Sequence, residues 1–85
     1  MRVYEDQFLE LVKEEVIRAR EKFPTTEKLL VALQEEAGEV AKSFLDYGQF
    51  SHQALEELVQ VAAVALRLAN EGDTDFDNWK GLKTR

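Results

Sequence analysis

Acidic side chains at short helical spacing are the residues of this chain best suited to chemistry. The stretch "EEAGE" contains Glu35, Glu36 and Glu39, and the later stretch "ELVQ" contains Glu57 and Gln60. Residues three apart share one side of a helix, so Glu36 pairs with Glu39 and Glu57 with Gln60. Oxygen ligands of this kind favour Mg²⁺, Mn²⁺ or Ca²⁺ over zinc or copper. Two antiparallel helices carrying these pairs are therefore predicted to form a hard-metal site.

Two helical segments are predicted in the first half of the chain. Apolar residues recur at helical spacing over residues 3–23. Pro24 ends this segment, because proline disfavours helical conformation in the residue before it. Thr25 and Thr26 offer N-caps for a second helix, and Gly48 supplies its stop. This second helix carries the first acidic pair.

A third helix follows Ser51, which is a suitable N-cap. Its stretch over residues 58–69 is apolar almost all round, as in helices that are buried among others. The chain shows no alternating strand pattern and no internal repeat. We therefore predict an all-α helix bundle of three main helices, forming a single domain over residues 1–85 with residues 74–85 as a short C-terminal tail.

Length and composition limit the remaining choices. A chain of 85 residues buries only about 60 to 65% of its unfolded surface, so a partner subunit would add stability. We expect a second subunit to complete a four-helix unit. The chain has no cysteine, which fits a cytoplasmic setting. Its formal net charge of −6 argues against binding a nucleic acid polymer. The N-terminus lacks a signal-peptide core and no apolar run is long enough for a bilayer, so we expect a cytoplasmic protein without membrane contact.

The helical phase places the glutamates of the second helix on different sides of it. With Leu33 at the centre of its buried face, five other apolar residues fall within about 60°: Leu29, Leu30, Ala37, Val40 and Phe44. Glu36 lies at the edge of this stripe, whereas Glu35 points to nearly the opposite side. Acids in helices are mostly solvated, but an acid at the core edge requires a cation, a hydrogen bond or a raised pKa. The phase thus singles out Glu36 from its neighbours.

These motifs resemble those of one known family. "EEAGE" and "ELVQ" match the two halves of E-E-x-x-E, a variable spacer and E-x-x-D, which mark the MazG-like all-α NTP pyrophosphohydrolase superfamily. The flanking text "LLVALQEEAGEVAKSFLDYG" and "LEELVQVAAVALRLANEGD" is also similar in its apolar pattern. The resemblance covers about residues 23–73, most of the chain.

The resemblance implies an enzyme dependent on Mg²⁺, or Mn²⁺, that cleaves an NTP or dNTP between the α and β phosphates. The products would be the monophosphate and pyrophosphate, and the assembly a homodimer or homotetramer. Carried over by position, Glu36, Glu39 and Glu57 would be catalytic metal ligands. Gln60 would take the ligand place of the usual aspartate, although an amide brings no charge and cannot act as a base. Glu35 would stand behind the ligands or on the surface.

Residues near the C-terminus also have candidate roles. Lys80 and Lys83 are candidates for phosphate contact, with a solvated basic terminus as the alternative. Trp79 would either stack on a base or cover a core or interface. Two alternative functions also fit the sequence. One is a non-catalytic helical oligomerisation or interaction module, with Glu36 and Glu57 in salt bridges to Lys42, Arg67 or a partner; the other is an enzyme resembling phosphoribosyl-ATP pyrophosphohydrolase.

Overall fold

The computed structural model describes residues 2–77, with side chains described as far as residue 75, and is all-α as predicted. The helices are α1 (Glu5–Lys22), α2 (Leu29–Tyr47), α3 (His52–Glu71) and the short α4 (Thr74–Asp77). The described residues include no strand. None of these helices combines the length and apolar character needed to cross a membrane.

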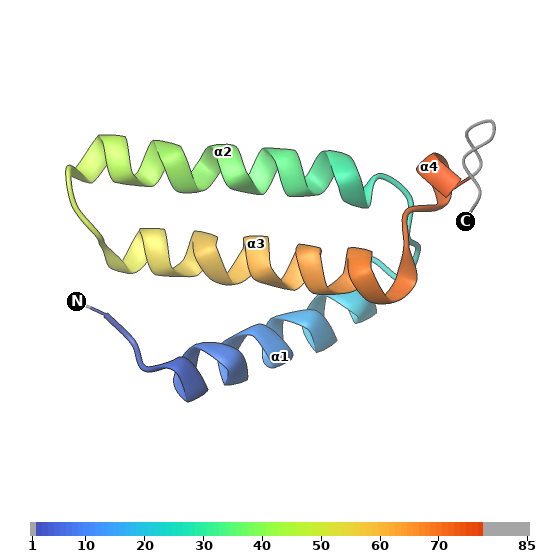
Figure 1. Cartoon of the computed structure of the whole chain (residues 1–85), viewed down its shortest axis with the longest axis horizontal. Helices are drawn as coiled ribbons and strands as arrows, with labels where there is room; N and C mark the ends of the chain where they lie inside the picture. The colour runs from blue at the N-terminus through green and yellow to red at the C-terminus, as the bar shows by residue number, and fades with distance from the viewer. Residues whose placement is uncertain (1, 78–85) are drawn as a thin grey trace.

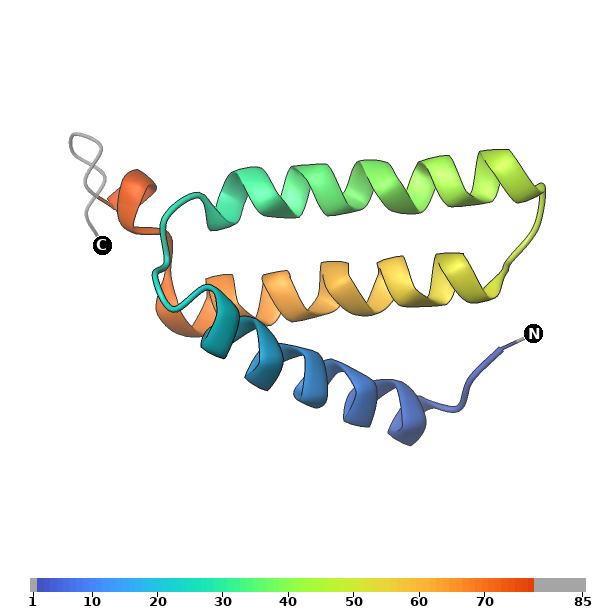
Figure 2. The same cartoon turned by 180° about the vertical axis from the view of Figure 1, so that it is seen from behind.

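Helix α3 packs against both α1 and α2, and lies between them in Figures 1 and 2. In the described part of the chain, α1 and α2 have little contact with each other. The core forms where α1 meets α3, and its buried members are Val12, Val16, Leu55, Val59 and Ala63. Because α1 and α2 share only α3 as a packing surface, α3 also forms the floor between them.

Two helix ends agree with the sequence analysis. The Ser51 hydroxyl accepts a 3.0 Å hydrogen bond from the amide of Ala54, as an N-cap does. Gly48 follows α2 with φ +70°, a left-handed conformation that glycine adopts without steric penalty. Its amide donates to the carbonyl of Phe44 at 2.7 Å. The hairpin of α2 and α3 is therefore closed by local signals.

The start of α2 differs from the prediction that Thr25 or Thr26 caps it. The helix begins at Leu29, after Lys28 in a left-handed conformation with φ 61° and no capping side chain of its own. The cap comes from a distant residue, since the Leu30 amide donates to Asp73 Oδ2 at 2.7 Å. A carboxylate at this end also suits the positive end of the helix dipole. A residue 43 positions away thus does what the local threonines were expected to do.

The buried face of α2 also differs from the prediction centred on Leu33. Leu29 and Ser43 are buried, Glu36 is half-buried, and the three recur at seven-residue intervals within about 40° of one another on the helix. Three residues predicted to be buried are exposed instead: Leu30, Ala37 and Phe44. The reason is that, among the described helices, α2 packs mainly against α3, so its buried stripe is narrow. Glu36 consequently lies nearer the centre of this stripe than its edge.

The apolar stretch of α3 is not buried all round either. Its exposed residues include Ala65, Leu66 and Ala69, whereas Val59 and Ala63 are buried. The sides of α3 that face α1 and α2 are covered, because these are the two helices that pack against α3 among the described residues. An apolar strip therefore remains open on α3 as well as on α2.

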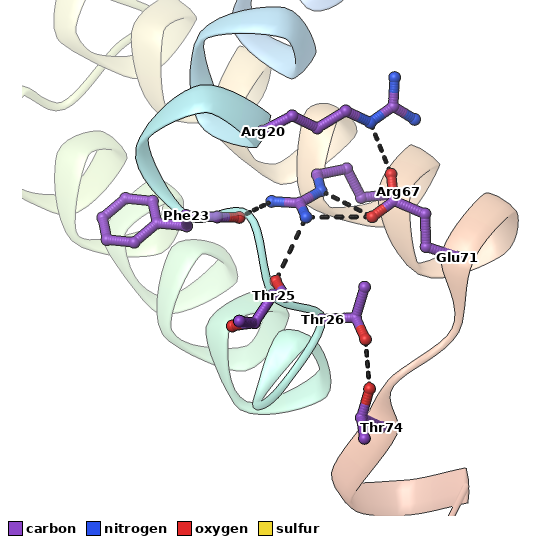
Figure 3. Close-up of polar contacts among 7 residues, drawn as sticks. All are labelled: Arg20, Phe23, Thr25, Thr26, Arg67, Glu71 and Thr74. Atoms are coloured by element: carbon purple, nitrogen blue, oxygen red, sulfur yellow. Dashed lines mark hydrogen bonds and ion pairs between the residues drawn. The ribbon is translucent and has the colours of Figure 1, made fainter.

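Arg67 is the buried charge that fixes the connection between α1 and α2. Its side chain is 3% exposed and donates from Nη1 to the carbonyl of Phe23 at 3.0 Å and from Nη2 to that of Thr25 at 3.3 Å. Figure 3 shows these bonds together with the ion pair to Glu71, in which Nη2 and Oε1 are 3.0 Å apart. Arg20 reaches the other oxygen of Glu71 from α1 at 2.5 Å. One guanidinium thereby ties the end of α1 and the following loop to α3.

The loop is held from the C-terminal side too. The hydroxyl groups of Thr26 and Thr74 are hydrogen-bonded, and the Thr74 amide donates to the Thr26 carbonyl at 3.2 Å. The start of α4 therefore lies against the start of α2, where the Asp73 cap also acts. The segment predicted as a plain tail is in this part a structural element.

Replacing Arg67 by alanine is expected to lower the free energy of unfolding by about 3 kcal/mol, because two loop carbonyls lose their donor and Glu71 loses a partner. Arg20→Ala is the matched control. It removes an exposed ion pair to the same Glu71, which is worth about 1 kcal/mol or less. Urea denaturation of both variants measures the difference. Equal losses would show that Arg67 does not hold the loop in the way its bonds indicate.

Candidate functional site

A cleft of about 420 Å³ lies at the end of the molecule where α1 leads into α2. Its floor is α3 and its walls are the last turns of α1 and the first half of α2. Nine of its lining residues are polar or charged: Glu15, Arg18, Thr25, Glu27, Lys28, Glu35, Glu36, Gln60 and Arg67. Small-molecule sites in proteins commonly have volumes of about 300 to 1,000 Å³ and combine apolar walls with a few polar groups. The cleft is thus of a size and composition suited to a small polar ligand.

Two of the sequence-predicted residues meet across the helices beside this cleft. The carboxyl groups of Glu36 on α2 and Glu57 on α3 lie close enough to share a hydrogen bond. Both side chains are half-buried, and Glu57 also accepts a 2.8 Å hydrogen bond from Nε2 of Gln53. Antiparallel packing of α2 on α3 is what brings residues 21 positions apart in sequence together, since each stands on the face turned to the other helix.

The environment of Glu36 disfavours its charge. Burial is the main cause that raises the pKa of Glu36 above its ordinary value of 4.5, followed by the hydrogen bond and the charge of Glu57. The charges of Glu39 and Glu35 raise it further. Like charges at short range favour a shared proton or a bound cation over two free carboxylates. The Glu36–Glu57 pair therefore favours binding either a proton or a metal cation.

The other two acids of "EEAGE" are exposed. Glu39 lies one turn beyond Glu36 on α2 and acts on it through its charge. Glu35 is exposed, in agreement with its expected position away from the buried face, yet it borders the cleft. Among residues 2–77, no three or more His, Cys, Asp or Glu side chains are arranged around one possible ion position. This conformation presents a carboxylate pair, and Glu39 must turn toward it to complete a set of three.

Gln60 lies on the floor of the cleft. It is half-buried, borders the same cavity as Glu36, and follows Glu57 by three residues on α3. Its amide offers one acceptor oxygen and two N–H donors without any charge. The oxygen donors gathered here fit a hard divalent cation by their chemistry. They supply one charge fewer than an aspartate at position 60 would give.

The remaining predictions divide into residues that the structure places and residues outside it. Lys80, Lys83 and Trp79 lie outside the described residues. The salt bridges considered for the non-catalytic alternative are formed with other acids within the chain. Lys42 pairs with Asp46 at 3.0 Å and Arg67 with Glu71.

Arg18 is a cleft residue that the sequence analysis did not select. It stands on α1 and pairs with Glu15, one turn earlier, through Nη2 and Oε2 at 2.6 Å. In the sequence, such an i, i+3 pair is typical of a solvated helix surface. Only its placement beside the cleft distinguishes Arg18 from Arg20, the other arginine of this helix.

The raised pKa of Glu36 predicts a specific pH dependence of stability in metal-free buffer. Folded Glu36 keeps its proton to higher pH than the unfolded chain does, so its ionisation opposes folding. Its contribution to the free energy of unfolding therefore falls as pH rises from the ordinary carboxyl pKa through the raised one. Glu36→Gln removes this contribution and is expected to gain stability relative to wild type across that window.

Urea denaturation in the presence of a chelator, repeated between about pH 4 and 8, measures this difference. Glu10→Gln, on the exposed side of α1, is the control and should follow wild type. A constant offset between Glu36→Gln and wild type at every pH would contradict the raised pKa.

Comparisons with known proteins add no relative to this description. No protein-family model, no curated protein and no solved structure matches the chain. The function is therefore argued from the motif residues and from the geometry of the cleft.

Proposed function

We propose that this protein is a Mg²⁺-dependent nucleoside triphosphate pyrophosphohydrolase, which cleaves an NTP or dNTP between the α and β phosphates. The observation that carries the proposal is the Glu36–Glu57 pair, two half-buried carboxyl groups close enough for Glu57 to raise the pKa of Glu36, with Glu36 lining a cleft of small-molecule size. Two adjacent carboxylates attract a divalent cation, and such a cation bridges carboxylates to phosphates. The resemblance of "EEAGE" and "ELVQ" to the MazG-like motifs supports the same function.

The residues of the chain have distinct roles in this proposal. Glu36 and Glu57 would hold Mg²⁺, or Mn²⁺ in its place, with Glu39 as a third ligand. An ion held there would supply charge neutralisation of the phosphates and polarisation of the reacting phosphorus. Gln60 contributes its oxygen from the floor of the cleft or positions a water through its amide. Because it lacks charge, the proton-accepting role falls to a glutamate.

The reaction is hydrolysis of a phosphoanhydride bond. A water oxygen bonds to the reacting phosphorus, and the bond between that phosphorus and the oxygen bridging the α and β phosphates breaks. The water proton passes to a carboxylate, and pyrophosphate and the monophosphate leave. A carboxylate close to the bound ion that does not itself coordinate it is the kind of proton acceptor this step needs.

A second copy of the chain completes the assembly in this proposal. Leu30 and Phe44 on α2 and Leu66 on α3 are 45%, 38% and 36% exposed, respectively. Apolar side chains of this kind on two paired helices support a homodimer or homotetramer in which α2 and α3 meet their counterparts. The covered faces would also shield the half-buried acids from water.

A second candidate is a non-catalytic helical interaction module. Two observations favour it. Gln60 is uncharged, and no three acidic side chains among the described residues surround one possible ion position. A metal-dependent response separates the two, because an interaction module has no use for a divalent cation at Glu36 and Glu57. An enzyme resembling phosphoribosyl-ATP pyrophosphohydrolase would share the site and differ in substrate, so that substrate belongs in the assay.

The enzyme hypothesis predicts release of monophosphate and pyrophosphate from at least one member of a panel of canonical and modified NTPs and dNTPs with Mg²⁺ or Mn²⁺. Glu36→Gln and Glu57→Gln are each expected to lower kcat/KM at least about 100-fold, because each removes a charged ligand. Glu10→Gln should retain wild-type activity. Chromatographic product analysis gives the readout. Silence across the panel, without any metal-dependent change in melting temperature, rejects the enzyme hypothesis.

Gln60→Asp is expected to tighten Mg²⁺ binding, since it adds the missing charge to the cleft floor. The measurement is melting temperature against Mg²⁺ concentration, because a ligand that binds the folded state stabilises it in proportion to its affinity. Gln49→Asp, which adds the same charge at an exposed position between α2 and α3, is the control. Equal effects of the two variants would place Gln60 outside the metal site.

A further inference from the structure

Three cationic side chains border the cleft, and they differ in how they are used. Arg67 is 3% exposed and directs its donors at two loop carbonyls and Glu71. Lys28 stands in the left-handed residue that precedes α2. Arg18 extends from α1 with a side chain that is 55% exposed, and it is paired with Glu15. Of the two arginines, Arg18 is the one that solvent and a ligand can reach.

Arg18 occupies a wall common to two hollows. Glu15, Arg18 and Gln60 line the cleft between α1 and α2, and the same three line a neighbouring hollow between α1 and α3. The guanidinium is thus carried beside the cleft floor at Gln60, on the side opposite to α2. A ligand in the cleft would lie with the acid pair on one side and Arg18 on the other.

The pairing of Arg18 with Glu15 is asymmetric. Nε donates to Oε1 at 3.0 Å and Nη2 to Oε2 at 2.6 Å, so the guanidinium presents its fork to the carboxylate. The Glu15 side chain is only 13% exposed, whereas that of Arg18 is 55% exposed. The acid is therefore the fixed partner and the arginine the one free to move. An ion pair with so exposed a member is weak because water screens it, so another anion can replace the carboxylate.

We propose that Arg18 binds the phosphate chain of the nucleotide in the cleft, and that Glu15 holds the guanidinium when no nucleotide is present. The inference rests on the proposed function and names a residue for its substrate. The fork that now meets a carboxylate matches a phosphate equally well.

Arg18 reduces the negative charge that a triphosphate meets in the cleft. A triphosphate brings more negative charge than one divalent ion neutralises, and the cleft is lined by four acids, Glu15, Glu27, Glu35 and Glu36, against three cations, Arg18, Lys28 and Arg67. A positive group on the wall opposite the acid pair reduces the remaining repulsion. Arg18 supplies it from α1, whereas the sequence analysis had looked for it in Lys80 and Lys83.

The test is direct binding, measured by calorimetry with Mg²⁺ present. The probes are inorganic triphosphate and a nucleoside triphosphate whose α,β-bridging oxygen is replaced by methylene. Arg18→Gln is expected to weaken both about tenfold, the loss of one charge-assisted contact, while Arg18→Lys keeps part of the affinity. Arg20→Gln, an arginine of the same helix that pairs with Glu71, is the control and should bind as wild type does.

Glu15→Gln gives the opposite sign. It frees Arg18 from its competing carboxylate and removes one negative charge from the cleft, so it is expected to tighten triphosphate binding more than Glu27→Gln, which removes a cleft carboxylate that is not part of the Arg18–Glu15 pair. Weaker binding by Glu15→Gln would overturn the holding role. Circular dichroism melting checks the fold of each variant, and if Arg18→Gln fails to fold, Arg18→Lys and Glu15→Gln decide.

The outcomes separate this inference from the function on which it rests. If wild type binds neither probe and hydrolyses no nucleotide, the proposed function fails and the role of Arg18 with it. If wild type binds them and Arg18→Gln matches Arg20→Gln, only the inference is overturned. If Arg18→Gln alone is weak and its affinity for Mg²⁺ without nucleotide is unchanged, Arg18 is a phosphate-binding residue.

Discussion

Among the helices of residues 2–77, α3 is the packing surface that α1 and α2 have in common, and the architecture depends on this constraint. The core forms where α1 lies on α3, and the acid pair forms where α2 lies on it. Since α1 and α2 scarcely touch in the described chain, their relative position must be fixed elsewhere. The Arg67 bonds to the connecting loop do this at one end of the molecule. The cleft is the space left between two helices that are tied at that end and diverge from it (Figure 2).

The roles of individual residues could be predicted from the sequence where neighbouring residues in the chain determine them. Ser51 and Gly48 mark helix ends through their own backbone and side-chain chemistry, and both predictions are confirmed. The start of α2 could not be predicted, because its cap is Asp73, a residue far away in sequence. Arg18 was missed for the same reason, since its pair with Glu15 has the spacing of a surface pair and only tertiary packing sets it beside the cleft.

The buried face of α2 illustrates a second limit. An apolar stripe on a helix wheel shows which residues prefer burial, but not how many neighbours are available to bury them. Leu33 was taken as the centre, yet the chain alone covers the side around Leu29 and Ser43 and leaves Phe44 exposed. The helical wheel correctly predicts that Glu36 is more buried than Glu35. It understated how far Glu36 is drawn into the contact with α3, and this contact raises the pKa of Glu36.

The cap that Asp73 provides has a consequence for how the chain folds. The first turn of α2 becomes complete only when the end of α3 has docked against it, because its capping group follows α3 in the chain. A bond between residues so far apart raises the contact order of an otherwise local, helical topology. Amide protons at the start of α2 should then exchange through the same cooperative opening as the end of α3, rather than fraying independently as helix ends usually do. The two segments would behave as one folding unit although most of two helices separates them in sequence.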